Sequence, residues 1–397
     1  MKLAIVIPVL NEEKSIEGIL IRCLNAIPNI KKSSPVASVE IIVVSDGSTD
    51  NTVSIARNYL NTIKLIVFEQ NQGYGAAIKE GWAQSNADLL GFLDADGTCD
   101  PNFFVDLCNL LLIENADIAL GSRLNSNSQM PFIRRVGNVI YSTILSLVSF
   151  QKIKDTASGM RIVKRSSLDR ILPLPNGLHF TPAMSARAIL SHDLKIVEKD
   201  MEYHERAGVS KLNVIKDGVR FLAIILKMVL LYQPYKILTF FAIIGFSFCT
   251  MAMILPITSY IQTTKVEEWM IYRFIVSDVV GIISFLFLSA GYLTREILSI
   301  TLSYENSYKS FSLLNLFKPR WAFWIISIGL ITGSLLIYHS IFQRITTGIT
   351  YEHWSRYIVM SFCFSISFIF IINLIIAHIL ILIKERLAYL NSKNIYP

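Results

Sequence analysis

The sequence predicts an α/β domain with an open sheet, followed by a transmembrane domain of four helices. Two patterns lead to this prediction. In the first part of the chain, short apolar runs typical of buried strands alternate with stretches of helical periodicity. Beyond about residue 235 the chain is mostly apolar and contains long hydrophobic runs. We therefore expect two domains, residues 1–232 and residues 233–397.

The composition excludes an ordinary soluble protein. Of the 397 residues, 52% are hydrophobic and 17% are charged, and the mean hydropathy of +0.48 indicates that part of the chain lies in lipid. The net charge of +7 is compatible with nucleic acid, an anionic membrane surface or an acidic substrate. The apolar spans favour the last two, so we expect no nucleic-acid partner. The five cysteines form no CxxC pair, which argues against a disulfide framework or a zinc site.

Four strand–helix units are expected in the first domain. The apolar runs LAIVIPV, EIIVVS, KLIVF and DLLGFLD are each followed by a helical pattern, which predicts parallel pairing with helices on both faces of the sheet. The first run resembles a short signal peptide, but it lacks a cleavage site, so we interpret it as a buried strand. Ligands of such sheets bind beyond the carboxyl ends of the strands. Polar clusters fall at three of these ends, in residues 11–13, 46–50 and 94–96.

Two amphipathic segments and four apolar spans predict how the chain meets the membrane. The segments 132–150 and 211–232 have basic and apolar sides, which suits helices in the bilayer interface or, alternatively, ordinary core-packing helices. The spans are each about 20 residues or longer and are expected at about 237–257, 274–294, 321–343 and 357–383. Lysine and arginine are more numerous in the turn between the second and third spans than in the two opposite turns. This bias predicts that the first domain and both termini are cytosolic.

The strongest local signal is FLDADG, in which Asp94 and Asp96 directly follow a buried strand. Two carboxylates at a strand end can hold a divalent cation, Mg or Mn, which neutralises a departing diphosphate. A DxD pattern alone is weak because surface turns contain it by chance, but its position after a strand favours the metal site. At a second strand end, VVSDGSTDNT places Asp46 in a tight turn that opens into the same crevice. There its carboxylate could accept a hydrogen bond from a base or ribose.

A series of motifs resembles the family 2 glycosyltransferases with the GT-A fold. The motifs occur in the order and spacing of that family: IPVLNEE, SDGSTDNT, NQGYGAAIKEGW, LDADGTCDP, GSRL, DTASGMRIVKR and YHERAGVSKL. More narrowly, the chain resembles the dolichyl- or polyprenyl-phosphate sugar synthases, including dolichol-phosphate mannose synthase. The motifs cover about residues 1–230, and the four-span tail is similar to the membrane domain of some members. The series as a whole is specific, whereas no single motif is.

The resemblance implies roles for individual residues. It assigns donor binding to Pro8, Glu12, Asp46, Asp94, Ala95, Asp96, Arg206 and Lys211. The cation is assigned to Asp94 and Asp96, which form the predicted catalytic set together with Arg206. The acceptor phosphate is assigned to Arg123, Arg134 and Ser210. Arginine forks bind phosphate oxygens in pairs, whereas lysine supplies a mobile point charge.

Two positions near these residues are left open. Dolichol-phosphate mannose synthases commonly have glutamine two positions after the second aspartate, where this chain has Thr98. The DADG form also resembles relatives that transfer glucose, so both the metal shell and the donor stay open. Asp155 of DTASGMR either orients the sugar or the acceptor, or has a structural role.

The reaction implied by the resemblance is inverting transfer of a hexose from GDP-mannose or UDP-glucose to polyprenyl or dolichyl phosphate. A lipid monophosphate has a second pKa of about 6 and is largely a dianion at neutral pH, so no dedicated base is required. We expect in-line attack by a phosphate oxygen, with the cation and Arg206 stabilising the leaving diphosphate. The expected partners are a nucleotide sugar, the lipid phosphate and the lipid bilayer.

Two other functions compete with this reaction. A processive polysaccharide synthase would share the fold, but its usual QxxRW motif has no counterpart, because the only RW pair, Arg320-Trp321, lies between two apolar spans. A lipid-sugar flippase with a nucleotide-sensing domain would need polar or interrupted helices at mid-membrane, and the spans contain few such features. The sequence therefore favours a sugar transferase that is anchored by its spans.

Overall fold

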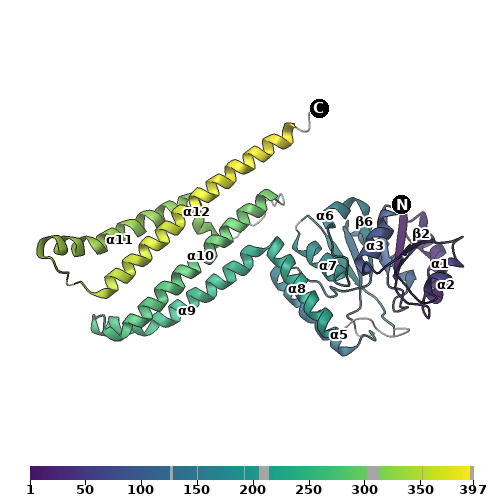
Figure 1. Ribbon diagram of the computed structural model, residues 1–397, viewed down its shortest axis with the longest axis horizontal. Helices are drawn as coiled ribbons and strands as arrows, with labels where there is room; N and C mark the ends of the chain where they lie inside the picture. The colour runs from purple at the N-terminus through teal and green to yellow at the C-terminus, as the bar shows by residue number, and fades with distance from the viewer. Residues whose placement is uncertain are drawn as a thin grey trace. The chain divides into compact units, whose positions relative to one another are not determined.

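The structure is a computed structural model that describes residues 1–125, 128–149, 151–191, 193–204, 214–301, 313–350 and 352–393. The chain divides into two compact units, Met1–Tyr232 and Gln233–Pro397. The first unit is an α/β domain and the second is a group of long helices (Figure 1). The predicted fold class, an α/β domain followed by apolar helices, is confirmed.

A seven-stranded mixed sheet forms the centre of the first unit. Its strands are β1 (Lys2–Val9), β2 (Ser38–Asp46), β3 (Lys64–Phe68), β4 (Leu89–Leu93), β5 (Ile118–Ser122), β6 (Met160–Lys164) and β7 (Ile196–Asp200). They lie in the order β3-β2-β1-β4-β6-β5-β7. Pairing is parallel between β1 and β2, β1 and β4, β2 and β3, and β5 and β7. β6 runs antiparallel to both of its neighbours, β4 and β5.

The four predicted strands, β1 to β4, pair in parallel with one another as expected. β6, which the sequence analysis did not predict, runs antiparallel because of the path of the chain between β5 and β6. Helix α5 (Phe132–Ser149) and the loop after it stay near the carboxyl end of β5, where Arg123 is hydrogen-bonded to Asp155. β6 consequently starts where β4 finishes, and Met160 pairs with Leu93. Contacts of the loop before β6 set the direction of this strand. Such contacts join residues distant in the chain, so local sequence patterns do not predict them.

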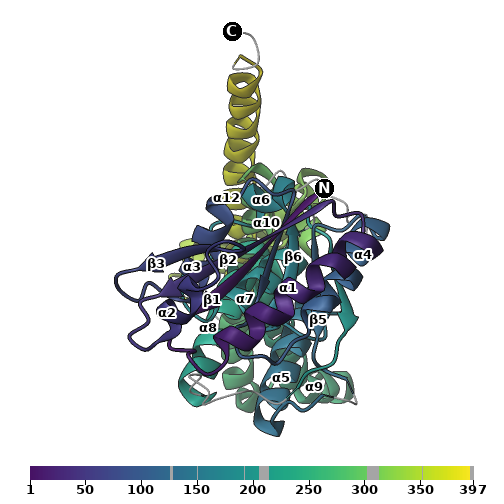
Figure 2. The ribbon, with the colours of Figure 1, turned by 90° about the vertical axis from the view of Figure 1, so that its right-hand side faces the viewer.

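Helices cover both faces of the sheet (Figure 2). Besides α5 they are α1 (Ile16–Ser33), α2 (Thr52–Arg57), α3 (Tyr74–Ala83), α4 (Phe104–Ile113), α6 (Leu168–Ile171), α7 (Phe180–Leu190) and α8 (Val214–Tyr232). The core that includes α1 and α4 contains Leu3 and Ile5 of β1, and the core that includes α3 and α7 contains Ala4 and Val6. Successive side chains of a strand point to opposite faces, so β1 is buried on both sides.

α5 and α8 pack against each other and leave apolar side chains exposed. The hydroxyl of Tyr141 donates to the carbonyl of Gly218 at 2.8 Å, and its ring packs edge-on against Phe221. The exposed apolar residues of the pair include Phe132, Ile133, Val136, Val139, Ile140, Leu147, Val219, Leu226, Leu230 and Leu231. The two helices fall within the predicted amphipathic segments, of which residues 150 and 211–213 lie outside the described part of the chain.

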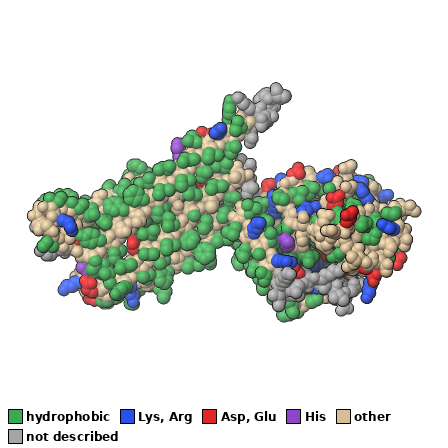
Figure 3. Space-filling model, viewed as in Figure 1, with side chains coloured by type: hydrophobic (Ala, Val, Ile, Leu, Met, Phe, Trp, Pro, Cys, Tyr) green, Lys and Arg blue, Asp and Glu red, His purple; other side chains and the backbone are tan. Residues whose placement is uncertain are grey.

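The described part of the second unit contains four helices that are long and apolar enough to cross a bilayer. They are α9 (Pro234–Thr263), α10 (Ile271–Thr301), α11 (Pro319–Thr347) and α12 (Trp354–Lys393). Each of them contains one of the predicted spans, so the prediction of four membrane-length helices is confirmed. Hydrophobic side chains cover most of the visible face of these helices (Figure 3).

Aromatic stacking and a buried polar contact join the helices inside the second unit. The ring of Phe317 stacks on Phe370 with centroids 4.3 Å apart and on Tyr292 at 5.6 Å. The amide of Asn373 in α12 donates to the hydroxyl of Ser289 in α10. Hydrogen bonds between helices stabilise packing in lipid, where apolar burial alone provides little driving force.

Two helical glycines lead to opposite predictions about stability. A Cβ at Gly81 of α3 would lie 2.5 Å from Cγ1 of the buried Val6, whereas a Cβ at Gly18 of α1 would meet nothing within 4 Å. We expect Gly81→Ala to destabilise the first unit by about 1–3 kcal/mol, because the close contact outweighs the helix propensity of alanine. Gly18→Ala should be neutral or stabilising by up to about 1 kcal/mol. Thermal unfolding of the full chain in detergent measures both, and equal midpoints would contradict the packing of α3 on β1.

Candidate active site

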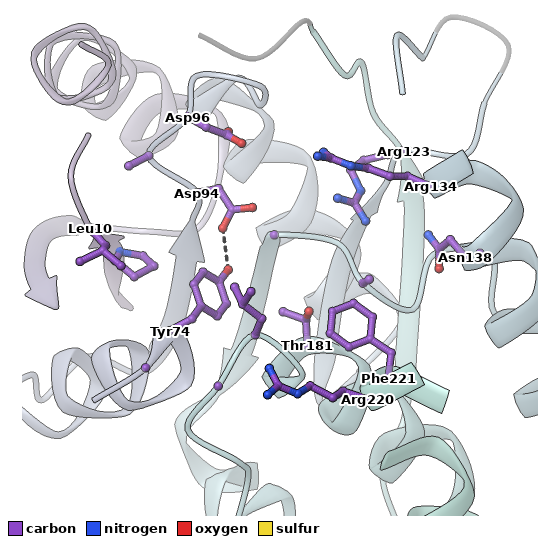
Figure 4. A pocket seen from close by; sticks show the side chains of 18 of the residues that line it. Leu10, Tyr74, Asp94, Asp96, Arg123, Arg134, Asn138, Thr181, Arg220 and Phe221 are labelled. Carbon is purple, nitrogen blue, oxygen red and sulfur yellow. Dashed lines mark hydrogen bonds between the residues drawn. The ribbon is translucent and has the colours of Figure 1, made fainter. Parts of the chain in front are cut away.

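Asp94 lies just beyond the carboxyl end of β4, where it contacts the start of α3 and the backbone that leads into β6. The hydroxyl of Tyr74, the first residue of α3, donates to Oδ1 of Asp94 at 2.6 Å (Figure 4). A Cβ placed on Gly159 would lie 1.8 Å from Oδ2 of the same carboxylate. The backbone that enters β6 therefore lies directly against Asp94, and a residue with a side chain would displace it.

Asp96 is held within its own turn. The hydroxyl of Thr98 donates to Oδ1 of Asp96 at 2.7 Å, and the N–H of Thr98 donates to the same oxygen at 3.2 Å. Gly97 between them has a φ of +76°, a left-handed conformation that favours glycine. Each carboxylate of FLDADG is thus joined to a hydroxyl group through one of its oxygens.

Both carboxylates line a cavity of about 580 Å³ in the first unit. The sequence-predicted site residues that the structure describes all line this cavity, namely Pro8, Glu12, Asp46, Asp94, Ala95, Asp96, Arg123 and Arg134. Arg206, Ser210 and Lys211 lie outside the described residues. Figure 4 shows Arg123 and Arg134 across the cavity from Asp94 and Asp96. We call these two sides the basic wall and the acidic wall.

Asp46, at the end of β2, holds the backbone of a neighbouring turn. Its Oδ1 accepts from the N–H of Gln72 at 2.6 Å, and its Oδ2 accepts from the N–H of Gly73 at 3.0 Å. Gly73 has a φ of +108°, and a Cβ there would lie 2.5 Å from the carbonyl oxygen of Asn176. Asp46 therefore positions the turn that carries Tyr74, while it also borders the cavity.

Hydrogen bonds join the loops that follow β1 and β2, next to Asp46. The N–H of Thr49 donates to Oδ1 of Asn11 at 2.7 Å, and the N–H of Glu12 donates to the hydroxyl of Thr52 at 2.8 Å. Asn11 has a φ of 49°, a left-handed conformation that asparagine tolerates better than most residues. The two loops form one edge of the cavity.

Arg123 forms a buried ion pair with Asp155 on the basic wall. Its Nε donates to Oδ2 of Asp155 at 2.7 Å and its Nη2 donates to Oδ1 at 2.9 Å. The amide of Asn138 in α5 and the N–H of Ala157 also donate to Oδ1. Burial alone would raise the pKa of Asp155, but the charge and hydrogen bonds of Arg123 outweigh burial and lower it to about 2. Asp155 therefore has a structural role, because it fixes Arg123 and joins it to α5.

The sequence reasoning missed a second buried arginine, Arg161 of β6. Its guanidinium donates to the carbonyls of Ser158 and Thr156 and to the hydroxyl of Ser185. Burial lowers the pKa of Arg161 to about 10, so the group stays charged at neutral pH. A signal was present, since an arginine inside the apolar strand MRIVK has to find partners in the interior. Arg161 holds the loop of residues 155–159 between the acidic and basic walls.

The cavity also has lining residues to which the sequence reasoning assigned no role in the site. They include Ile133 and Tyr141. Figure 4 shows four others, Tyr74, Thr181, Arg220 and Phe221. Tyr74 stands inside the motif NQGYG, where its place at the start of a helix next to a strand end was the available signal. Arg220, which pairs with Asp217 at 3.4 Å, and Phe221 lie on α8 and reach the cavity only through the packing of α8 against α5 and α7.

Asp94 and Asp96 fit a divalent cation that is shared with a bound diphosphate. Carboxylate oxygens are preferred ligands of Mg²⁺ and Mn²⁺. Within the described parts of the chain, no group of three or more His, Cys, Asp or Glu residues could hold a metal ion. Magnesium sites often combine one or two carboxylates with phosphate oxygens and water. The donor set here agrees with such a site.

Comparison with known proteins identifies the class of this chain. The sequence profile of "Glycosyl transferase family 2" matches residues 4–172. This segment makes up most of the first unit, which is therefore similar to the family 2 glycosyltransferases. Within that family it is related to the dolichyl-phosphate hexosyltransferases and the polyprenyl-phosphate sugar synthases. The resemblance carried by the motifs is confirmed.

Individual relatives match parts of the chain. The low-salt glycan biosynthesis hexosyltransferase Agl6 of Haloferax volcanii is 30% identical over 222 residues, which are 55% of this chain and 51% of that protein. The dolichyl-phosphate beta-glucosyltransferase ALG5C of Trichomonas vaginalis is 28% identical over 240 residues, 57% of this chain and 70% of that protein. The chain therefore spans about half the length of the first of these relatives.

A solved structure is also similar to the chain. It is glucosyl-3-phosphoglycerate synthase from Mycobacterium tuberculosis, in complex with Mn2+, uridine-diphosphate and glucosyl-3-phosphoglycerate. The similarity covers 57% of this chain and 79% of that chain, with a TM-score of 0.44 and 20% sequence identity.

The buried ion pair leads to a prediction that separates charge pairing from packing. Arg123→Met should destabilise the first unit by about 3–5 kcal/mol, because Asp155 would be left buried without its partner. The double variant Arg123→Met with Asp155→Leu should recover part of this loss, since the buried carboxylate is gone, while the donors Asn138 and Ala157 lose their acceptor. Thermal unfolding of the full chain in detergent checks both variants. A double variant as unstable as the single one would show that the fold needs the charges themselves.

Proposed function

We propose that the chain transfers a hexose from a nucleotide-diphosphate sugar to polyprenyl or dolichyl phosphate, with inversion at the anomeric carbon. The observation that carries this proposal is the cavity of the first unit, with a carboxylate pair on one wall and arginines on the other. The carboxylates could bind a diphosphate through a cation. The arginines could bind an anionic acceptor directly.

The donor is assigned to the acidic wall. Pro8, Glu12 and Asp46 border the cavity at the loops after β1 and β2 and would take the nucleoside. Asp94 and Asp96 would hold the diphosphate through Mg²⁺ or Mn²⁺, which when bound supplies charge neutralisation for the leaving group. Ala95 lies between them, is buried, lines the cavity and would also contact the donor.

The acceptor phosphate is assigned to the basic wall. Arg123 and Arg134 line the cavity there, and Asp155 holds Arg123 in place. Ile133 of α5 and Phe221 of α8 add apolar side chains to the lining of the same cavity. An anionic head followed by an apolar chain, as in a lipid phosphate, matches this combination of side chains.

Roles are also proposed for the residues of YHERAGVSKL that the structure does not describe. Arg206 would act as a catalytic and donor-binding residue, Lys211 would bind the donor, and Ser210 would bind the acceptor phosphate. The N–H of His204 donates to the carbonyl of Thr98 at 3.0 Å. His204 is the last described residue before the segment that contains Arg206. Its contact with Thr98 supports the proposal, because Thr98 belongs to the turn that carries Asp96.

The proposed reaction needs no general base from the protein. In the described part of the chain, the carboxylates that line the cavity are Glu12, Asp46, Asp94 and Asp96. Asp155 already accepts hydrogen bonds from several donors around it. A phosphate dianion can attack the anomeric carbon without losing a proton. The nucleoside diphosphate would leave on the side opposite the attack, which gives inversion.

The membrane is the proposed setting of the reaction. The four long helices would make the chain an integral membrane protein, and α5 and α8 would lie in the bilayer interface with their exposed apolar side chains in lipid. The same two helices line the cavity, so the lipid phosphate would reach the basic wall from the membrane surface. The cytosolic side for the first unit and both termini is proposed from the charge bias of the turns.

Glucose and mannose are the proposed hexoses, from UDP-glucose and GDP-mannose respectively. Relatives from Trichomonas vaginalis, Drosophila melanogaster and Saccharomyces cerevisiae are named dolichyl-phosphate beta-glucosyltransferase. Together with the DADG form of the carboxylate motif, these relatives favour glucose.

Sugar transfer in membranes tests the proposal. Membranes that contain the chain should transfer radiolabelled sugar from UDP-glucose or GDP-mannose to polyprenyl phosphate, and EDTA should abolish the transfer. Asp96→Asn should lower the rate by about 100-fold or more, because it removes a charge that holds the cation. Asp106→Asn is the matched control, since Asp106 pairs with Lys199 outside the cavity, and it should keep full activity. Absence of labelled lipid with both donors would contradict the proposed substrates, and retention of anomeric configuration would contradict the mechanism.

The pH dependence should follow the acceptor rather than the protein. Below about pH 6 the acceptor gains a proton, so kcat/KM for the lipid phosphate should fall by about tenfold per pH unit as the dianion disappears. A phosphonate acceptor has a higher second pKa, and the acidic limb of the profile should move upward with it. An acidic limb that stays in place when the acceptor is changed would indicate a titrating protein base.

A further inference from the structure

Each carboxylate of the proposed cation site accepts a short hydrogen bond from a hydroxyl group to which the family resemblance assigns no role. Tyr74 donates to Oδ1 of Asp94 at 2.6 Å, and Thr98 donates to Oδ1 of Asp96 at 2.7 Å. Groups that hydrogen-bond to metal ligands orient them and tune their affinity for the metal. The hydroxyl of Tyr74 can orient Asp94 in this way, and the hydroxyl of Thr98 can orient Asp96.

Tyr74 is rigidly placed by its own surroundings. It begins α3, whose first turn is held by the carbonyl of Asn176, which accepts from the N–H of Ala76 at 3.1 Å. The ring packs edge-on against Phe92 with centroids 6.4 Å apart. The helix start and the ring packing together fix the phenol where its hydroxyl donates to Asp94.

The two carboxylates are restrained in different ways. Asp94 is held from two sides, by the hydroxyl of Tyr74 and by the backbone of Gly159, where a Cβ would lie 1.8 Å from Oδ2. Asp96 is held from within its own turn, where both the hydroxyl and the N–H of Thr98 donate to Oδ1. Neither carboxylate can rotate without breaking a hydrogen bond or displacing the backbone.

We propose that Tyr74 and Thr98 are positioning residues that make Asp94 and Asp96 each present a single oxygen to the cation, and thereby favour Mg²⁺ or Mn²⁺ over Ca²⁺. This inference rests on the proposed function in one respect, the use of the carboxylate pair as a cation site. Mg²⁺ requires nearly octahedral geometry with ligands at about 2.0–2.1 Å. Ca²⁺ takes six to eight oxygens at about 2.3–2.6 Å and often binds both oxygens of one carboxylate. A hydrogen bond that occupies Oδ1 disfavours this second mode.

The inference also explains the residue at position 98. Thr98 stands two positions after Asp96, where the sequence left the metal shell open. In the structure its hydroxyl donates to Asp96, so Thr98 acts on the cation through that carboxylate. A hydroxyl two residues after an aspartate is a good local donor to it, since the turn brings the two side chains together.

The test measures cation binding and not catalysis. Binding of Mn²⁺ to the purified full chain in detergent is followed by the electron paramagnetic resonance signal of free Mn²⁺, in the presence of UDP and, separately, GDP. Tyr74→Phe and Thr98→Val remove the hydroxyl groups and keep the size of the side chains. Each variant should weaken Mn²⁺ binding by about 10–100-fold. Competition with Ca²⁺ should show that the ratio of Mn²⁺ affinity to Ca²⁺ affinity is smaller in both variants than in the wild type.

Matched controls are available on the surface of the first unit. Tyr59 donates to the carboxylate of Glu17 at 3.2 Å, and Thr62 donates to the carbonyl of Tyr59 at 2.9 Å. Neither residue lines the cavity. Tyr59→Phe and Thr62→Val remove the same chemical groups and should bind Mn²⁺ as the wild type does. A thermal unfolding midpoint recorded for each variant separates loss of binding from loss of the fold.

The possible results separate this inference from the proposed reaction. Unchanged Mn²⁺ affinity and Ca²⁺ discrimination in folded Tyr74→Phe and Thr98→Val would overturn the inference and leave the reaction standing. A wild-type chain that binds no Mn²⁺ with either nucleotide would overturn both the cation site and the inference. Weaker binding in the two variants, in a chain that transfers no sugar from either donor to polyprenyl phosphate, would support the inference and contradict only the proposed substrates.

Discussion

The antiparallel pairing of β6 with β4 is the constraint on which the site depends. This register places the start of β6 beside the end of β4, so the residues before β6 and those after β4 emerge at the same point of the sheet. Gly159 then lies against Asp94, and Asp155, a few residues earlier, reaches Arg123 at the end of β5. A single strand pairing thus brings the acidic wall and the basic wall to opposite sides of one cavity.

The loop that joins the two walls is rigid because its buried polar groups are paired. Moving a charge out of water costs several kcal/mol, and Asp155 and Arg161 are both fully buried. Asp155 is stabilised by the charge of Arg123. Arg161 donates to neutral acceptors, two backbone carbonyls and the hydroxyl of Ser185, and the charge of Asp155 also favours its charged form. Alternative conformations of the loop would leave these groups without partners, so the network favours one arrangement.

Much of the acidic wall could be predicted from the sequence. A run of apolar residues followed directly by Asp94 and Asp96 marks the end of a buried strand, and strand ends of an open α/β sheet meet at one edge. The motif series added Arg123 and Arg134 on the basis of family resemblance. Tyr74 was missed although it stands inside a motif, because its hydrogen bond joins α3 to the residue that follows β4 and depends on how the helix packs against the sheet.

The sequence by itself determined the first four strands with the helices that follow them, the four membrane-length helices and the polar residues that end three of these strands, because hydrophobic periodicity and run length are local properties of the chain. It did not predict β5, β6 and β7. Only the tertiary structure decided the direction of β6, the pairing of Arg123 with Asp155, and the approach of α8 to α5 that brings Phe221 into the cavity. These features join residues that are distant in the chain. Their geometry follows from packing and from the need to pair buried polar groups, which the spacing of residues along a sequence does not contain.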